Sequence, residues 1–175
     1  MKTINTKRLL LRKFNPYDCY DMFEYLSDVD VQLPAGGVVH QTITHTRKLL
    51  EKLVTRDNIW AIELVDENKV IGAIGAYNLT QNDILERHIG FELNKKYWNK
   101  GYVTEAAQAM IKHLFEDLRM DRVVMSHYPF NEASERIAEK LGFVKEGYLR
   151  KEDRILTGKI VDRVIYSIIK EEYFK

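Results

Sequence analysis

The centre of the chain reads Glu92-Leu93-Asn94-Lys95-Lys96-Tyr97-Trp98-Asn99-Lys100-Gly101-Tyr102-Val103-Thr104-Glu105-Ala106-Ala107. Leading into it, side chains at 86–93 alternate between two sets with the two-residue period of a strand. Downstream, apolar residues recur at helical spacing over four turns, namely Val103, Ala106, Ala107, Met110, Ile111, Leu114 and Leu118. The pattern predicts a strand that leads through a short basic loop into a helix, with Gly101 at the turn into the helix.

This loop has the features of a phosphate site. The first turn of a helix presents free backbone N–H groups and the positive end of the helix dipole, and a glycine there lets a ligand approach the backbone closely. Lys95, Lys96 and Lys100 add positive charge. The residues therefore indicate a site for phosphate or pyrophosphate. An ordinary strand–loop–helix connection with solvated lysines would have the same sequence features, and short glycine motifs often match by chance.

A second motif follows a buried-looking strand predicted at 121–128. It reads Asn131-x-x-Ser134-x-x-x-x-Glu139-Lys140-Leu141-Gly142-Phe143-x-x-x-Gly147. Asn131 is a good N-cap for a helix that Gly142 would end. On this evidence alone, Ser134 is an ordinary residue of the first helical turn.

Periodicity and turn residues predict the remaining elements. Further strands are expected at 6–14, 59–65, 70–77, 143–149 and 160–169. Helices are expected from Asn15-Pro16 onward and at 42–56, and the segment 29–41, with Pro34 and two glycines, is expected to be a loop. Polar turns are expected at 66–69, 81–83 and 157–159. Arg8 and Arg12 are expected to be exposed strand residues. Because no linker divides the chain, residues 1–175 are expected to form one domain.

Composition narrows the class of protein. Hydrophobic residues make up 45% of the chain, and 27 Lys+Arg against 26 Asp+Glu give a net charge of +1, which argues against a general nucleic-acid binder. Cys19 is the single cysteine, so no internal disulfide is possible, and a partly buried structural thiol is expected. No apolar run reaches membrane-spanning length, so we expect a cytoplasmic protein without a membrane partner. His40 and His45 lack further ligands at suitable spacing, so no metal site is expected.

The two motifs together resemble the GNAT family of N-acetyltransferases. The segment from Trp98 to Ala106 resembles the family's acyl-CoA pyrophosphate loop, Gln/Arg-x-x-Gly-x-Gly/Ala followed by a helix, and departs from it at Trp98 and Val103. The Trp variant and the opening Thr-Lys-Arg-Leu-Leu-Leu-Arg resemble the ribosomal-protein N-acetyltransferase (Rim-type) branch. The motif that begins at Asn131 resembles the second conserved block of the family. The resemblance covers nearly the whole chain.

The resemblance implies a fold and a set of binding residues. The expected fold is a mixed α/β (α+β) fold, in which a strongly bent, mainly antiparallel sheet of about six to seven strands has helices on both faces. The strands would splay apart and hold the pantetheine arm of acetyl-CoA like an added strand through Leu93 and Asn94, with Asn131 as a further contact. The pyrophosphate would bind the backbone of Asn99, Lys100, Gly101, Tyr102, Val103 and Thr104.

Glu92 is the candidate general base. It is the acidic residue at the end of the strand that enters the loop, on the face shared with Glu86 and His88. From spacing alone, a solvated glutamate on a half-covered sheet is the more ordinary reading. The resemblance favours a catalytic carboxylate, because some family members place one on this strand, and it implies that Ser134 protonates the departing thiolate. His127 is the next candidate for the base.

The implied reaction transfers the acetyl group of acetyl-CoA to a primary amine by direct attack, with no metal and no covalent enzyme intermediate. A lysine amine has a pKa of about 10.4 and an α-amino group about 7.7–8.0, so the α-amino group needs less help at neutral pH. The Rim-type resemblance suggests the N-terminal α-amino group of a (ribosomal) protein. A small amine such as an antibiotic or polyamine, and a non-catalytic acyl-CoA-binding or sensing module, stay open, as do the monomeric and homodimeric states.

Overall fold

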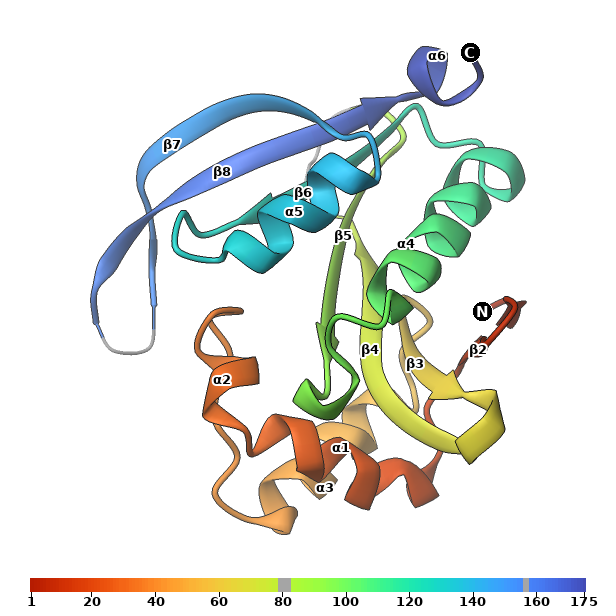
Figure 1. The fold of residues 1–175 in the computed structure, drawn as a ribbon, viewed down its shortest axis with the longest axis vertical. Coiled ribbons are helices and arrows are strands. Elements are labelled where there is room, and N and C mark those ends of the chain that lie inside the picture. The colour runs from red at the N-terminus through yellow and green to blue at the C-terminus, as the bar shows by residue number, and fades with distance from the viewer. Residues whose placement is uncertain (79–82, 156–157) are drawn as a thin grey trace.

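The structure is a computed structural model that describes residues 1–78, 83–155 and 158–175 (Figure 1). Within these residues the strands form one sheet of eight, in the order β1-β2-β3-β4-β5-β6-β8-β7. The strands are β1 Ile4–Asn5, β2 Leu9–Arg12, β3 Ile59–Leu64, β4 Lys69–Tyr77, β5 Glu86–Leu93, β6 Arg122–His127, β7 Val144–Arg154 and β8 Ile160–Ile169. The expected mixed fold is confirmed, and the strand count is slightly higher than expected because the two residues of β1 also pair.

Helices cover both faces of the sheet (Figure 1). They are α1 Cys19–Leu26, α2 Val29–Gln32, α3 Ile43–Leu53, α4 Tyr102–Lys112, α5 Glu132–Lys140 and α6 Lys170–Tyr173, with single turns η1 Pro16–Asp18, η2 Val65–Glu67 and η3 Lys95–Tyr97, and a π-helical turn η4 His113–Asp117. One core contains the buried residues of α4 and α5, and a second contains those of α1 and α3. The sheet therefore separates two apolar cores.

The neighbours β5 and β6 run parallel, whereas every other recorded strand pair within the described residues is antiparallel. Their pairing runs from Glu86–Arg122 to Ile89–Met125 and stops there. β5 continues to Leu93, paired with β4 on its other side. The two strands thus part in the middle of the sheet, which leaves the last four residues of β5 with an edge that β6 does not cover.

Glycine lets β4 lie close against the end of β5. A Cβ atom on Gly72 would lie 2.2 Å from the backbone oxygen of Glu92. No side chain fits at that distance, so Gly72 marks a close approach of the two backbones. The position of the Glu92 backbone therefore depends on a neighbour without a side chain.

The N-terminal arginines differ from the expectation of exposed strand residues. Arg12 is half-buried and donates two hydrogen bonds of 2.8 Å to the buried carboxylate of Asp18, and its Nε donates to Glu63 at 2.5 Å. Arg8 pairs with Glu105 of α4. The partners are distant in sequence or lie across a turn, so the local alternation of β2 does not reveal them.

Several local predictions are confirmed. Asn15 caps η1 with Pro16 in its first turn, and Cys19 is buried. Asn68 completes the turn between β3 and β4 in the left-handed region with φ of 47°. The segment 29–41, expected as a loop, begins instead with the one-turn helix α2, because the side chain of Asp28 caps it. Two other turns were predicted, at 81–83 and 157–159. Their residues Gln81, Asn82 and Thr157 lie outside the described residues.

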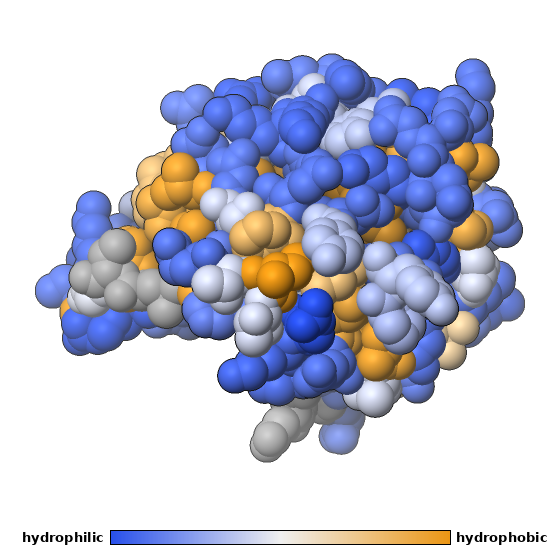
Figure 2. Space-filling view, turned by 90° about the horizontal axis from the view of Figure 1, so that it is seen from below, coloured by the Kyte–Doolittle hydropathy of each residue, from blue (hydrophilic) through white to orange (hydrophobic). Residues whose placement is uncertain are grey.

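The strands β7 and β8 form a long hairpin that projects beyond the body of the molecule (Figure 1). From the underside, hydrophobic patches lie between hydrophilic side chains (Figure 2). Val29, Leu33 and Val38 of the segment 29–41 are exposed. Among the described residues, no helix has the length and apolar character needed to cross a membrane.

Candidate active site

The connection from β5 to α4 turns on two left-handed residues. Asn99 has φ of 61° and Gly101 has φ of 78° at the N-cap of α4. A left-handed N-cap suits glycine, and it brings the first N–H groups of α4 to the end of the loop, where a helix provides no acceptors for them. The predicted geometry of strand, loop and helix is confirmed.

A partly buried ion pair fixes the start of α4. The carboxylate of Glu105 accepts hydrogen bonds from the Thr6 hydroxyl at 2.7 Å, the Arg8 backbone N–H at 2.9 Å and Arg8 Nε at 2.7 Å. Burial raises the pKa of Glu105, but these bonds outweigh burial and lower it. Arg8 Nη1 also donates to the Lys100 carbonyl at 3.0 Å, and its guanidinium lies 4.3 Å from the centre of the Tyr102 ring. Arg8 therefore supports the loop, a role that the sequence interpretation missed.

Trp98 and Val103, the two departures from the family pattern, have structural roles. The indole N–H of Trp98 donates to the carbonyl of Leu93 at 2.8 Å and so closes the loop onto the end of β5. Val103 is 8% exposed and belongs to the core under α4. Its side chain points away from the loop surface, so the β-branched residue leaves the first turn of α4 open.

Asn94 forms its hydrogen bonds with other residues of the protein. Its N–H donates to Ile71, its carbonyl accepts from Tyr97, and its side chain accepts from Lys96 N–H and donates to Glu24. These bonds engage the backbone and both ends of the side-chain amide. The geometry favours a role in shaping the loop over the expected contact with pantetheine.

A cavity of about 440 Å³ lies where β5 and β6 part. Its wall brings together four of the residues singled out in the sequence, Glu92, His127, Asn131 and Ser134, from β5, β6 and the start of α5. The other lining residues are Pro34, Ala35, Leu49, Leu53, Arg56, Ile59, Ala73, Gly75, Tyr77, His88, Ile89, Gly90, Phe91, Met125, Ser126, Tyr128 and Arg163. The loop from Asn99 to Thr104 and the side chain of Leu93 are not part of this wall.

Glu92 is a half-buried carboxylate in this wall. Its Oε2 accepts a hydrogen bond of 3.0 Å from Nε2 of Gln32 in α2. Burial raises the pKa of Glu92, and the bond from Gln32 opposes the rise only in part. Burial and then the charge of Glu92 raise the pKa of both Tyr25 and Tyr77. Glu92 is thus not the solvated glutamate that spacing alone suggested, because α1 and α2 cover its face of the sheet.

Asn131 caps α5, as predicted. Its Oδ1 accepts from the Ser134 N–H at 3.1 Å, while its Nδ2 donates to the Pro34 carbonyl at 3.0 Å. Ser134 is half-buried, and its hydroxyl makes no hydrogen bond within the part of the chain that the structure describes. The serine hydroxyl is therefore available to a ligand in the cavity.

The segment 29–41 crosses between the two sides of the cavity. Gln32 bonds to Glu92 on β5, and Pro34 bonds to Asn131 at α5. A Cβ atom on Gly36 would lie 2.8 Å from the ring of Tyr128, so the glycine packs directly on the aromatic ring. The segment thus contacts both the candidate base and the start of α5.

Metal ligands do not gather in the described residues. No group of three or more His, Cys, Asp or Glu side chains is close enough there to hold an ion. His40 and His45 meet edge to face with ring centroids 6.1 Å apart, and Nδ1 of His40 lies 2.9 Å from the Thr46 hydroxyl.

We expect Glu92→Gln to stabilise the protein at neutral pH. The folded-state pKa of Glu92 is raised above its unfolded value, so the carboxylate contributes nothing below the unfolded pKa and destabilises the fold as pH rises through the folded pKa. Glutamine keeps the shape and can still accept from Gln32. Thermal denaturation at pH 7 should show a higher Tm, by about 2–4 °C for each kcal/mol that the substitution adds to the free energy of unfolding.

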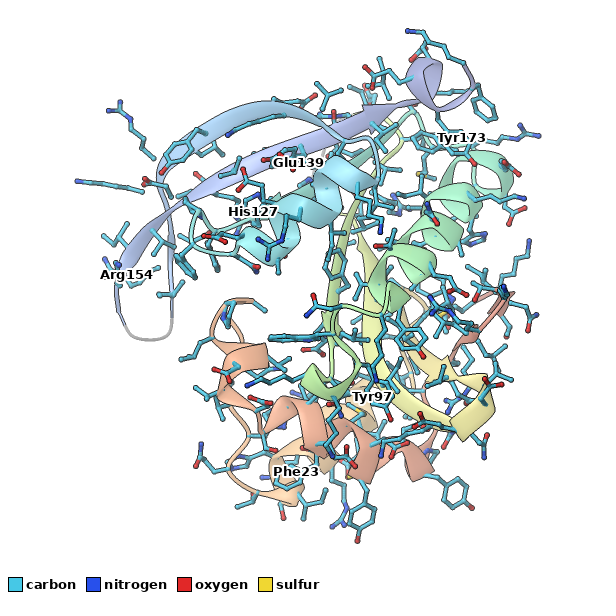
Figure 3. The ribbon with its side chains drawn as sticks, viewed as in Figure 1. Phe23, Tyr97, His127, Glu139, Arg154 and Tyr173 are labelled. Atoms are coloured by element: carbon cyan, nitrogen blue, oxygen red, sulfur yellow. The ribbon has the colours of Figure 1, made fainter. Side chains whose placement is uncertain are left out.

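The difference in Tm should vanish below about pH 4, where unfolded glutamate is protonated. Glu139→Gln, which replaces an exposed carboxylate on α5 (Figure 3), is the matched control and should match wild type at both pH values. A lower Tm for Glu92→Gln at pH 7 would contradict the burial argument.

Comparison with known proteins agrees with this geometry. The family profile "Acetyltransferase (GNAT) domain" matches residues 8–144. The "Uncharacterized N-acetyltransferase YnaD" of Bacillus subtilis (strain 168) is 33% identical over 175 residues, 97% of this chain and 98% of that protein. The ribosomal protein uS5-alanine N-acetyltransferase of Escherichia coli (strain K12) is 26% identical over 108 residues, 62% of this chain and 55% of that protein.

A crystal structure of a GNAT-family acetyltransferase from Bacillus anthracis matches the fold with a TM-score of 0.90 at 33% identity, covering 98% of this chain and 100% of that one. The resemblance noted in the sequence is therefore confirmed over the full fold. The chain belongs to the GNAT acetyltransferase family and is an acetyl-CoA-dependent N-acetyltransferase.

Proposed function

We propose that the enzyme acetylates the α-amino group at the N-terminus of a peptide or protein, with Glu92 as general base. The observation that carries the proposal is the half-buried carboxylate of raised pKa in the cavity where β5 and β6 part. A base works best when its pKa lies near the operating pH, so burial of Glu92 suits it to take a proton from an amine. The relative from Escherichia coli is named a ribosomal protein uS5-alanine N-acetyltransferase, which supports a protein amine as the acceptor.

The residues of this chain fit acetyl-CoA along one continuous path. The N–H groups at Gly101 and the first turn of α4 suit a pyrophosphate. The uncovered edge of β5 at 90–93 suits an extended arm that pairs like an added strand. The path ends at the cavity, where Asn131 and Ser134 lie at the start of α5. Acetyl-CoA supplies the activated acetyl group at that end.

The protein's part in the reaction follows from this placement. Glu92 accepts the proton of the attacking amine, whose nitrogen bonds to the acetyl carbon while the carbon–sulfur bond breaks. The Ser134 hydroxyl is the proposed proton donor to the departing sulfur. Gln32 holds one oxygen of Glu92 in place, which orients the carboxylate toward the cavity. Nδ2 of Asn131 carries a second N–H besides the one that it donates to Pro34, and this donor suits a pantetheine carbonyl.

A small amine that carries a carboxylate is the second candidate acceptor. Exposed Arg56 lines the cavity and forms no ion pair with the residues that the structure describes. Its charge lowers the pKa of Tyr77, whereas burial and the charge of Glu92 raise it, so Arg56 and Glu92 both lie near this ring. Such a pair would bind a carboxylate and an amine at once. A polyamine fits less well, because Arg56 repels cations.

An acceptor screen tests the proposal. Release of free coenzyme A should be followed with short peptides, the same peptides carrying a blocked N-terminus, free amino acids and polyamines. We expect peptides with a free α-amino group to give the highest kcat/KM and the blocked peptides to give none. Equal turnover of blocked peptides that retain a lysine would contradict α-amino specificity, and a preference for free amino acids would establish the second candidate.

Glu92→Gln should lower kcat by about 10²–10⁴-fold, because a positioned base contributes that much. Calorimetry should show unchanged affinity for acetyl-CoA, and the loss should shrink as rising pH supplies more neutral amine. The Glu139→Gln enzyme, changed on an exposed carboxylate, should keep the wild-type rate. A Glu92→Gln rate within about threefold of wild type at neutral pH, too small for a base effect, would assign the base elsewhere.

Gly101→Asp should abolish acetyl-CoA binding. The side chain adds a negative charge where the pyrophosphate is proposed to lie, and it strains a residue with φ of 78°. Gly142→Asp is the matched control, because Gly142 has φ of 80° at the end of α5, and no atom of the described residues lies within 4 Å of its missing Cβ. Calorimetry should show binding by the control alone. Equal affinity of folded Gly101→Asp and wild-type protein would remove this loop from the site.

A further inference from the structure

His127 carries a buried ring nitrogen without a protein partner. The residue is 6% exposed and lines the cavity at the end of β6, next to α5 (Figure 3). Its Nε2 makes no hydrogen bond to any described residue. An unmet buried acceptor or donor costs free energy, and in a cavity wall it points to a ligand that completes the bond.

The other ring nitrogen fixes what Nε2 can do. Nδ1 lies 2.9 Å from the backbone carbonyl of Tyr128. A carbonyl only accepts, so Nδ1 must carry the proton, and in the neutral ring Nε2 is then an acceptor. The ring also stacks on Tyr166 with centroids 5.4 Å apart, and the Tyr166 hydroxyl donates to Glu135 of α5. These contacts hold the ring in one orientation.

Strand alternation places His127 and Glu92 on opposite faces of the sheet. Met125 pairs with Ile89 at the last rung between β6 and β5, and both belong to the core under α4 and α5. His127 lies two residues beyond Met125 and shares that face, whereas Glu92 lies three residues beyond Ile89 and points to the other. The slot between the strands therefore has a carboxylate on one face and an imidazole acceptor on the other.

We propose that Nε2 of His127 accepts the S–H hydrogen bond of the product coenzyme A. The inference rests on the proposed function, in which the amine approaches on the Glu92 side and the thioester lies in the slot. We place the departing sulfur on the side of the slot with His127, opposite the approaching amine. Acetyl-CoA has no proton on sulfur, so this bond is available only after transfer, and it favours the product thiol over the substrate thioester.

Calorimetry with three ligands tests this role. Wild-type protein should bind coenzyme A about three- to tenfold more tightly than desulfo-coenzyme A, the difference expected for one modest hydrogen bond. His127→Phe keeps a ring to stack on Tyr166 and removes the acceptor, so the two affinities should become equal. Its affinity for acetyl-CoA should stay at the wild-type value. His45→Phe, which changes an exposed histidine on α3, should behave as wild type.

Other results would overturn the proposal. Equal weakening of all three ligands by His127→Phe would assign Nε2 to a pantetheine amide, and a raised KM for the amine alone would assign it to the acceptor. If the variant does not fold, wild-type protein still decides, because equal affinities for coenzyme A and desulfo-coenzyme A exclude a thiol contact. Absence of any coenzyme A binding would instead contradict the proposed function itself.

Discussion

The point at which β5 and β6 stop pairing is the constraint on which the site depends. Four rungs join the strands, and the last is Ile89–Met125. Beyond it β5 pairs with β4 on its other side, and Gly72 allows the two backbones to approach closely. A sheet interrupted in its centre would leave backbone groups without partners, so the gap is useful only if a ligand with extended geometry fills it.

The interruption also lets the two faces of the sheet contribute different chemistry to one cavity. The face under α1 and α2 supplies Glu92, oriented by Gln32. The opposite face, packed against α5, supplies the ring of His127 and the Ser134 hydroxyl. Each face has its own apolar core, so these polar side chains are positioned by separate packed layers.

Features encoded by neighbouring residues could be predicted from the sequence. The turn at Gly101, the cap at Asn131 and the alternating strands each follow from a few consecutive side chains, and the structure has them all. The fold as a whole needed the family resemblance in addition, because strand order and the gap between β5 and β6 depend on residues far apart.

Contacts between distant segments could not be predicted in this way. The burial of Glu92 depends on Gln32, which lies 60 residues earlier. The alternation of neighbouring side chains predicted only that Glu92 is a polar residue on a strand. The interpretation of Arg8 as an exposed strand residue missed its ion pair for the same reason, since its partner Glu105 is 97 residues away. The orphan nitrogen of His127 depends on a ring orientation that no spacing in the sequence specifies.

The pairing of Arg8 with Glu105 makes the beginning of the chain a brace for a loop in its middle. Thr6 and Arg8 together supply three donors to one carboxylate on the first turns of α4, and the guanidinium also holds the Lys100 carbonyl. The N-terminal residues therefore do more than lengthen the sheet edge. Any change that loosens β2, including the addition or removal of residues ahead of it, would be transmitted to the loop that we propose binds acetyl-CoA without altering a single residue of the loop itself.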